Sequence, residues 1–396
     1  MSIMQNILRR YLLAYRNKIT NKLFGRAFIP HQGKKKGVVL LSFLTGPFTL
    51  APGEFYTDPH SNNWASPEIA RLFSERGYDV DVINWDNDRF IPRKKYAVCI
   101  DMQYNLERLS PYLPKNCIKV MHLVASYPEF QNNAEQARIR ALEKRRGVVL
   151  APSRTSPATS NPGIADFLLG YGNKTVHGTY SRFRKQVIPV PVPIMEKYDF
   201  PHDKNFEESK KHFLWFGGGG AVLKGLDLVL EVFATLPYLR LTIIGPSSFG
   251  KEFEEIYAKE LKLPNITRYE KPRFNKEGGE SMIGNIPVRE IIDQCGAILG
   301  LSASEGGGGA TVQAMQRGLF PIVTPQTGVS EIAPSVVIEN PTIENIKKAV
   351  EDFSNLPAER VAKLAKASWL FATEHHTKEA FTKRYENFID NVLKLP

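Results

Sequence analysis

The stretch from Leu299 to Gly318 reads Leu-Gly-Leu-Ser-Ala-Ser-Glu-Gly-Gly-Gly-Gly-Ala-Thr-Val-Gln-Ala-Met-Gln-Arg-Gly. Its pattern predicts a buried strand at 297–301, a turn of four glycines after Glu305, and a short helix from Thr311 to Arg317. Such a turn gathers free backbone N–H groups beside the positive end of a helix dipole, which favours an anion. Glu305 at its lip can accept hydrogen bonds from hydroxyls. A sugar nucleotide offers both features, although four glycines can equally form an unspecialised flexible loop.

The chain around this turn alternates strands and helices over 396 residues, a length that predicts two domains. Ser66 and Pro67 are expected to open a helix that runs to Arg76, as cap and first-turn residue. A second helix is expected at 131–146. The strand patterns of the first half fall at 37–44, 78–84, 96–101, 117–122, 148–151 and 185–192. This alternation predicts an α/β fold with a doubly wound parallel sheet of Rossmann type.

A second alternation follows the proline-rich segment 188–194. Its strands are expected at 212–216, 239–245, 297–301 and 319–324, and its helices at 224–235, 252–261, 286–294, 342–353, 358–371 and 377–395. The predicted organisation is an arm at 1–36, domains at 37–194 and 212–374 joined by a linker at 195–211, and a C-terminal helix at 375–396 packing back on the first domain. Ligands of such sheets bind at the carboxyl ends of the strands, so the cleft between the domains is the expected site.

The N-terminal arm carries most of the net charge of +11, because residues 1–36 hold nine Lys or Arg and no Asp or Glu. Apolar residues recur there at helical spacing, at Leu8, Leu12, Tyr15, Ile19 and Leu23. Arginines interrupt any apolar run, so the arm is neither a signal peptide nor a membrane span. A helix on an anionic membrane surface is favoured over one packed on its own protein or a partner. Nucleic acid is not expected, because the nearly neutral body lacks a basic stripe.

Two motifs of the second half carry a family resemblance. Lys224-Gly225-Leu226-Asp227 follows the glycine turn Gly217 to Gly220, and Glu305 opens the second turn. Together they resemble the retaining, family-4-like group 1 glycosyltransferases of the GT-B fold, in a bacterial branch. Weaker cues in the first half, such as Asn62-Asn63-Trp64 and Tyr127-Pro128-Glu129, extend the resemblance over most of residues 37–395.

The resemblance implies two Rossmann-like domains facing a cleft, and a role for each motif residue. Glu305 would bind the hydroxyls of the donor sugar, and Lys224 would hold the diphosphate and stabilise the leaving charge. His122 would lie near the donor sugar, although a hydrogen-bonded core histidine is an equal alternative. The implied donor-binding residues are Gly46, Gly217, Gly218, Gly219, Gly307, Gly308, Gly309, Ala310, Thr311 and Gln313.

The sequence departs from the family pattern at two positions. Gln313 stands where the family has a second Glu that binds ribose hydroxyls, and Gly219 stands where it has an Arg that binds the diphosphate. The missing cation is either absent or comes from elsewhere, with Lys271, Arg273 and Arg317 as candidates. No metal or cofactor is expected, because the Asp-x-Asp triplets at 79–81 and 86–88 fall in a strand and a turn.

The predicted function is transfer of a sugar from a nucleotide diphosphate sugar to a hydroxyl of a lipid-linked or surface-polysaccharide acceptor. The predicted location is the cytoplasmic face of a membrane, held peripherally through residues 1–26. A sugar-nucleotide epimerase on the same fold and a non-catalytic sugar-nucleotide or glycan-binding protein remain alternatives. A nicotinamide dehydrogenase is disfavoured, because no first-strand GxGxxG is followed by an acidic residue about 20 positions later.

Overall fold

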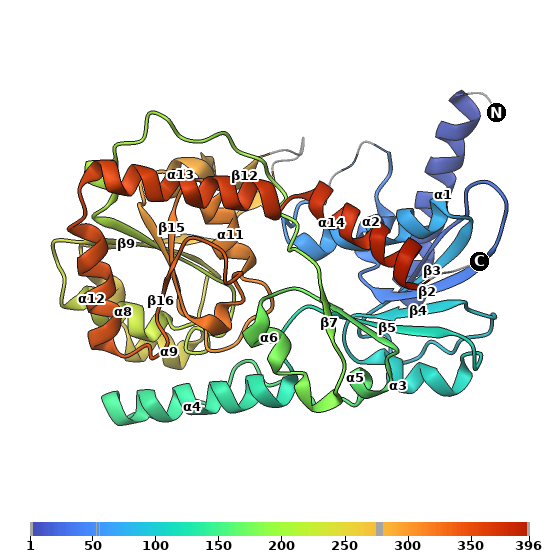
Figure 1. Cartoon of the computed structure of the whole chain (residues 1–396), viewed down its shortest axis with the longest axis horizontal. Coiled ribbons are helices and arrows are strands. Elements are labelled where there is room, and N and C mark those ends of the chain that lie inside the picture. The colour runs from blue at the N-terminus through green and yellow to red at the C-terminus, as the bar shows by residue number, and fades with distance from the viewer. Residues whose placement is uncertain (1–2, 53, 55, 275–279, 394–396) are drawn as a thin grey trace.

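The computed structural model describes residues 3–52, 54, 56–274 and 280–393, and shows two lobes side by side (Figure 1). Each lobe is a mainly parallel sheet covered by helices, as the alternation of strands and helices predicts. The last expected helical residues, 394–396, lie outside the described part of the chain.

The first lobe contains a seven-stranded sheet in the order β1-β3-β2-β4-β5-β6-β7. All pairs are parallel except β1, which runs antiparallel along β3. Its inner strands are buried on both faces, which is why they read as continuous apolar runs. The strands are β1 Arg26–Ile29, β2 Gly37–Phe43, β3 Tyr78–Asn84, β4 Val98–Asp101, β5 Ile118–Leu123, β6 Phe167–Gly170 and β7 Val187–Pro189.

The second lobe contains a six-stranded parallel sheet in the order β10-β9-β8-β14-β15-β16. Counted from the first strand of this domain, this is the 3-2-1-4-5-6 order of a Rossmann fold. The strand order reverses between β8 and β14, while all strands stay parallel. The strands are β8 His212–Phe216, β9 Arg240–Gly245, β10 Ile266–Glu270, β14 Ala297–Gly300, β15 Phe320–Val323 and β16 Val336–Val337. A small antiparallel sheet beside it contains β11 Arg273–Phe274, β12 Ser281–Ile283 and β13 Ile286–Pro287.

Helices cover both sheets. The α-helices of the first half are α1 Ile3–Phe24, α2 Ser61–Glu75, α3 Asn105–Leu109, α4 Pro128–Arg146, α5 Asn161–Ile164 and α6 Lys174–Gly178. Those of the second half are α7 Phe206–Ser209, α8 Leu226–Ala234, α9 Lys251–Ile256, α10 Val288–Ile292, α11 Gly309–Met315, α12 Ile343–Ser354, α13 Ala358–His375 and α14 Lys378–Asn387. A π-helical turn, Phe388–Leu393, continues α14.

The C-terminal helix returns to the first lobe, as the sequence predicts. Helix α13 runs along the second lobe, and α14 continues onto the first beside α2 (Figure 1). Phe381, Tyr385 and Phe388 are at most 1% exposed, in the same apolar core as strands β2 and β3. These aromatic side chains fasten the end of the chain to the domain in which it began.

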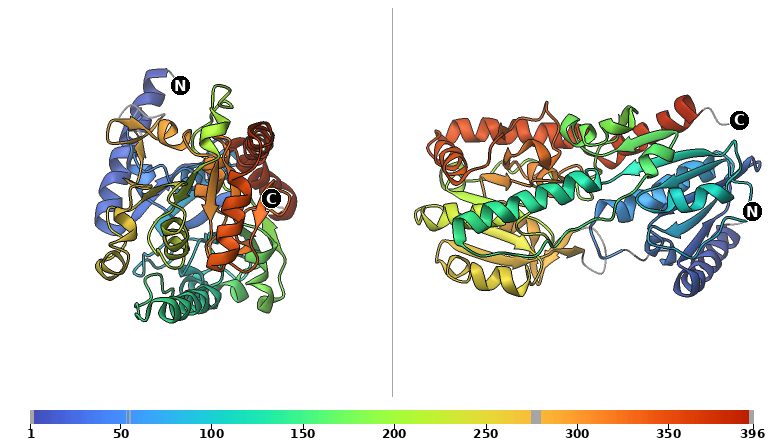
Figure 2. Two further views of the ribbon diagram at one scale, coloured as in Figure 1. Left: turned by 90° about the vertical axis from the view of Figure 1, so that its left-hand side faces the viewer. Right: turned by 90° about the horizontal axis from the view of Figure 1, so that it is seen from below.

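Helix α4 makes the opposite crossing, which the sequence did not suggest. It belongs to the first domain by chain order, yet it lies along the second lobe (Figures 1 and 2). Ile139 and Leu142 join the apolar core of that lobe. Arg145 Nη2 lies 2.6 Å from a carboxylate oxygen of Asp227 on α8, whose side chain is fully buried. The Asp of the Lys-Gly-Leu-Asp motif therefore holds a helix of the other domain.

Two local predictions are wrong. Helix α2 begins at Ser61, capped by His60, because the Ser66 hydroxyl bonds the backbone of Leu44 instead of capping the helix. Residues 148–151 form no strand; Leu150 instead packs in the apolar core of the second lobe after α4 ends. An apolar run of this length fits a buried strand and a buried loop equally well.

Replacing Arg145 by Met is expected to lower the free energy of unfolding by about 3–5 kcal/mol, because it leaves the buried Asp227 carboxylate without this partner. Urea titration measures the loss. Arg182→Met is the matched control, since the Arg182–Glu129 pair is more than half exposed on both sides and should contribute less than about 1 kcal/mol. Equal losses in the two variants would contradict the role given to Arg145.

Candidate functional site

Two loops meet where the strand order of the second sheet reverses, between β8 and β14. One follows β8 and carries Gly217 to Lys224; the other follows β14 and carries Glu305. The N–H of Ala303 donates to the carbonyl of Leu223 at 2.8 Å and joins the two loops directly. At this junction the Lys224 ammonium contacts the Glu305 carboxylate, and the Ser302 hydroxyl lies 3.3 Å from the same carboxylate oxygen. The two residues singled out in the sequence therefore lie side by side.

Lys224 is held in a setting that weakens its charged form. Its side chain is only 16% exposed, and its own carbonyl accepts a hydrogen bond from the Trp215 indole at 3.2 Å. Burial, together with the positive charges of Arg154 and Lys271, lowers the pKa of Lys224 to about 7. The touching Glu305 carboxylate favours the charged form and opposes that shift. An added anion would act in the same direction as Glu305.

The second glycine turn is closely packed, which the sequence alone did not indicate. A Cβ at Gly306 would lie 2.1 Å from the carbonyl oxygen of Val124, in the loop after β5 of the first domain. A Cβ at Gly307 would lie 2.3 Å from the side chain of Val192. The Ser126 hydroxyl and N–H donate to the Glu305 carbonyl at 2.8 and 3.1 Å. Here glycine permits the two domains to touch and fixes the position of Glu305.

The residues after this turn begin α11, whose first residue, Gly309, follows Glu305 by four positions. The helix starts at Gly309, after Gly308, so the N–H groups of its first turn have no carbonyl partner within the helix. Gly309 and Ala310 are half-buried, whereas Thr311 is 4% exposed. The predicted backbone donors at Gly309 and Ala310 are therefore placed at a helix start, and Thr311 packs inward.

Gln313 has a partner that accounts for its lack of charge. Its side-chain amide donates toward Glu196 Oε2 at 3.4 Å. Glu196, from the linker, is 6% exposed and also accepts from the Ser281 N–H and the Tyr198 hydroxyl. A Glu at position 313 would set two carboxylates against each other in a buried place. Because its amide is engaged, Gln313 keeps its carbonyl oxygen as an acceptor for a ligand.

The first glycine turn is more open. Gly217 packs against the Trp215 ring, whereas a Cβ at Gly219 would meet no atom within 4 Å. Among the candidates for the missing cation, Lys271 lies close, with its Nζ 3.9 Å from a Cβ built on Gly218. Arg317 is engaged by Asp293 and only 10% exposed, so it does not supply that charge.

His122 is a buried, hydrogen-bonded core residue, which the sequence left as an equal alternative to a place near the donor sugar. It is fully buried in β5, and its Nδ1 lies 2.5 Å from the hydroxyl of Tyr385 on α14. Its ring stacks on Tyr385 at 5.7 Å and meets Tyr171 edge-on at 4.9 Å. Burial lowers the pKa of His122 to about 3. This neutral histidine ties the C-terminal helix to the first domain.

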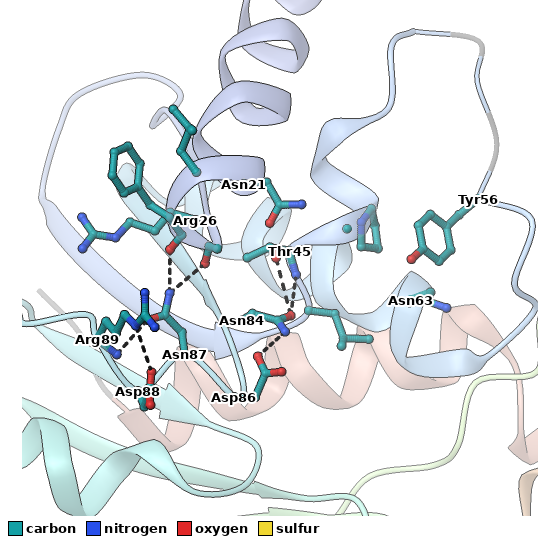
Figure 3. A pocket seen from close by; sticks show the side chains of 16 residues that line it. Asn21, Arg26, Thr45, Tyr56, Asn63, Asn84, Asp86, Asn87, Asp88 and Arg89 are labelled. Atoms are coloured by element: carbon teal, nitrogen blue, oxygen red, sulfur yellow. Dashed lines mark hydrogen bonds and ion pairs between the residues drawn. The ribbon is translucent and has the colours of Figure 1, made fainter.

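A cavity of about 770 Å³ lies in the first domain, beside the end of α1 (Figure 3). Gly46 lines it, and a Cβ there would lie 2.8 Å from the Tyr56 hydroxyl. Thr45, Asn84 and Asp86 form a polar wall at the carboxyl ends of β2 and β3. Neither Lys224 nor Glu305 lines this space.

Two further residues of the first domain reach the pair. The positive charges of Lys224 and Lys271 help lower the pKa of His60, after burial, and Arg154 lies against Gly220. No spacing in the sequence connects either residue with the motifs, because α4 and the loop before α2 bring them there through tertiary packing.

Residues 198–369 match the family model of glycosyl transferases group 1. The match covers the greater part of the second domain and less than half of the chain. The resemblance to group 1 glycosyltransferases seen in the sequence is confirmed for this part of the chain.

Solved structures share the two-domain GT-B fold of this chain. Sucrose-phosphate synthase from Thermosynechococcus elongatus has a TM-score of 0.61 at 12% identity, over 91% of this chain and 100% of that one. The E. coli trehalose-6-phosphate protein bound with UDP-2-fluoro glucose has a TM-score of 0.57 at 9% identity, over 91% and 100%. A mutant of S. aureus TarM, in complex with Fondaparinux, alpha-GlcNAc-glycerol and UDP, has a TM-score of 0.52 at 11% identity, over 74% and 55%. The chain thus spans about half the length of TarM, and no curated protein sequence matches it.

Changing Gln313 to Glu is expected to lower the free energy of unfolding by about 1–3 kcal/mol, because Glu196 loses an amide donor and gains a like charge. Adding Glu196→Gln should restore most of that loss, since the amide and carboxylate then exchange places. Urea titration of both single variants and the double variant gives the coupling. Additive losses would contradict a direct interaction between the two side chains.

Proposed function

We propose that the chain transfers a sugar from a nucleotide diphosphate sugar to an acceptor hydroxyl, with retention at the anomeric carbon. The observation that carries this proposal is the contact of Lys224 with Glu305 at the reversal of the second sheet. Doubly wound sheets bind nucleotides at that place. The family match of residues 198–369 supports the reaction class, and the UDP and UDP-sugar in the E. coli and S. aureus structures support the kind of donor.

The two side chains have complementary work in such a reaction. The Glu305 carboxylate accepts hydrogen bonds from sugar hydroxyls and orients the sugar. The Lys224 ammonium interacts with the diphosphate, whose negative charge grows as the bond from the anomeric carbon to the phosphate oxygen breaks. Backbone N–H groups at Gly309 and Ala310 can donate to the donor at the start of α11. The carbonyl of Gln313 remains available for a ribose hydroxyl.

The acceptor is proposed to enter from the first domain, through the cavity beside α1. This cavity lies at strand ends and offers amide, hydroxyl and carboxylate groups, which suits the polar head of a glycan or glycolipid. It adjoins Leu23 and Phe24 at the end of α1, both more than half exposed. A lipid-linked acceptor would place its head in the cavity and its lipid near this helix.

Helix α1 is suited to a membrane surface. It packs on its own domain through Ala14 and Asn17, and the Asn17 amide bonds both backbone groups of Phe28. Its apolar stripe points the other way: Leu8, Leu12, Tyr15, Ile19 and Leu23 are 43–66% exposed. Basic side chains flank this stripe. No helix in the described part of the chain is long and apolar enough to cross a bilayer, so we propose peripheral attachment to the cytoplasmic face.

The rival functions make different demands. An epimerase would convert the nucleotide sugar without an acceptor, and a binding protein would hold it without turnover. Incubating the chain with donor alone, and then with donor and a glycolipid acceptor, separates the three possibilities. The paired Lys224 and Glu305 favour transfer, because the pair suits a departing diphosphate as well as a bound sugar.

Lys224→Ala and Glu305→Ala are each expected to lower sugar transfer by at least about 100-fold while the fold is kept, because each removes a charge from the reacting centre. Transfer is measured with a panel of nucleotide sugars, and folding by thermal unfolding. Lys251→Ala and Glu255→Ala remove an exposed Lys–Glu pair of the same domain and serve as controls. Transfer at the unaltered rate in either site variant would refute the assignment.

Replacing Leu8, Leu12 and Tyr15 together by Gln is expected to abolish flotation with phosphatidylglycerol vesicles, because these exposed side chains supply the apolar contact. Binding of the unaltered chain should weaken in phosphatidylcholine vesicles, where the lysines and arginines find no anionic lipid. A control carries Gln at Val149 and Ile332, which are 71% and 75% exposed elsewhere. Flotation unchanged by the triple replacement would contradict the membrane role of α1.

A further inference from the structure

The first glycine turn has room for a cation that its own sequence does not provide. Position 219 is a glycine, and a Cβ there would have open space around it. Packing therefore does not require a glycine at this position. If the turn binds a diphosphate, Lys224 alone must balance the ligand's charge while it also contacts Glu305.

Arg154 lies against this turn and comes from the other domain. Its side chain packs on Gly220, where a Cβ would fall 2.6 Å from Arg154 Cγ. Gly220 has a φ of +86°, a conformation that favours glycine and leaves the approach to Arg154 open. The arginine therefore lies one residue from Gly219, where the family pattern has its own arginine.

The backbone around Arg154 is fixed by buried side chains of α4. The Glu135 carboxylate is 1% exposed and accepts from the N–H groups of Ser153 and Arg154 at 2.9 and 3.1 Å. The Gln131 amide donates to the Arg154 carbonyl at 2.6 Å. The buried Glu135 carboxylate thus accepts hydrogen bonds from two backbone amides of an exposed loop and fixes the position of the Arg154 backbone.

Helix α4 moves this anchor into the second domain. It is bound there by Arg145 to Asp227 and by Arg138, whose guanidinium donates to the Leu301 carbonyl at 2.8 Å. Leu301 directly follows β14, four residues before Glu305. Arg154 is thus a residue of the first domain by sequence and of the donor-binding wall by position.

Lys271 approaches the same turn from another loop of the second domain. It follows β10, and its Nζ is 3.9 Å from a Cβ built on Gly218. Arg154 and Lys271 form no ion pair with any residue in the described ranges, whereas Arg317 and Arg268 are paired. Arg154, Lys271 and Lys224 therefore lie at one turn, and the Glu305 carboxylate contacts only Lys224 among them in the described part of the chain. This excess of positive charge fits an anion carrying several charges.

We propose that Arg154 and Lys271 bind the diphosphate of the donor and replace the arginine missing at position 219. The proposal rests on the proposed function, because it assigns these two cations to the same donor site. Lys224 then lies at the sugar end with Glu305, and Arg154 and Lys271 hold the phosphates over the open glycines.

The test measures nucleotide binding by calorimetry. Among UDP, GDP and ADP, the one that binds the unaltered chain most tightly is titrated against Arg154→Gln and Lys271→Gln, with its nucleoside as a phosphate-free probe. Each replacement should lower the affinity for the nucleoside diphosphate by roughly 10–100-fold, the effect of losing one charge-assisted hydrogen bond. Binding of the nucleoside should stay the same. Arg240→Gln and Lys251→Gln, which are exposed at 54% and 87% in the same domain, should change neither.

A rescue variant separates direct binding from loss of structure. Gly219→Arg, added to Arg154→Gln, should recover at least tenfold of the lost diphosphate affinity, because position 219 has free space beside Gly220. Unchanged diphosphate affinity in both Arg154→Gln and Lys271→Gln would overturn this inference and leave the proposed function standing. Absence of nucleoside diphosphate binding by the unaltered chain would overturn the proposed function together with it.

Discussion

The close approach of two backbones at Gly306 is the constraint on which the site depends. The carbonyl of Val124 occupies the place where any side chain at Gly306 would begin, and a Cβ at Gly328 would fall 2.2 Å from the Gly306 carbonyl oxygen. The turn is thereby held between the first domain and the loop after β15. Ser126 completes the contact by bonding the Glu305 carbonyl from across the cleft. Glu305 owes its position to this three-way packing more than to the flexibility of glycine.

The sequence was sufficient where the determinants are local. A strand, a glycine turn and a helix in immediate succession place Lys224 and Glu305 at the carboxyl ends of β8 and β14. Parallel pairing of these strands then brings the two residues together, because adjacent strands of a parallel sheet end at one edge. The same logic gave the two doubly wound sheets and the returning C-terminal helix. Each of these features follows from periodicity and the end of one element.

The sequence was insufficient where a residue's partner lies in another part of the fold. His122 lies in the expected strand, one residue before its end, yet its role depends on Tyr385, 263 positions away. Gln313 stands where the family has a Glu, and only the structure shows that the Glu196 carboxylate lies beside it. Ser66 was expected to cap a helix, but Leu44 takes its hydroxyl. A buried polar side chain pairs with the groups that the fold places beside it, and those groups are set by the whole fold and not by the local sequence.

Two helices that cross between the lobes restrict how the domains can move relative to each other. Helix α14 carries the end of the second domain onto the first, while α4 carries part of the first domain onto the second. If both contacts are kept, relative movement of the sheets must be taken up in four segments: between α4 and α5, between β5 and α4, in the linker at 195–211, and between α13 and α14. Arg154 lies in the first of these connections, but Glu135 and Gln131 bind it to α4. It therefore moves together with α4. Parting the domains would break the contacts of Ser126 and Val124 with the second glycine turn, and also the hydrogen bonds from Asn173 to the carbonyls of Pro325 and Val329.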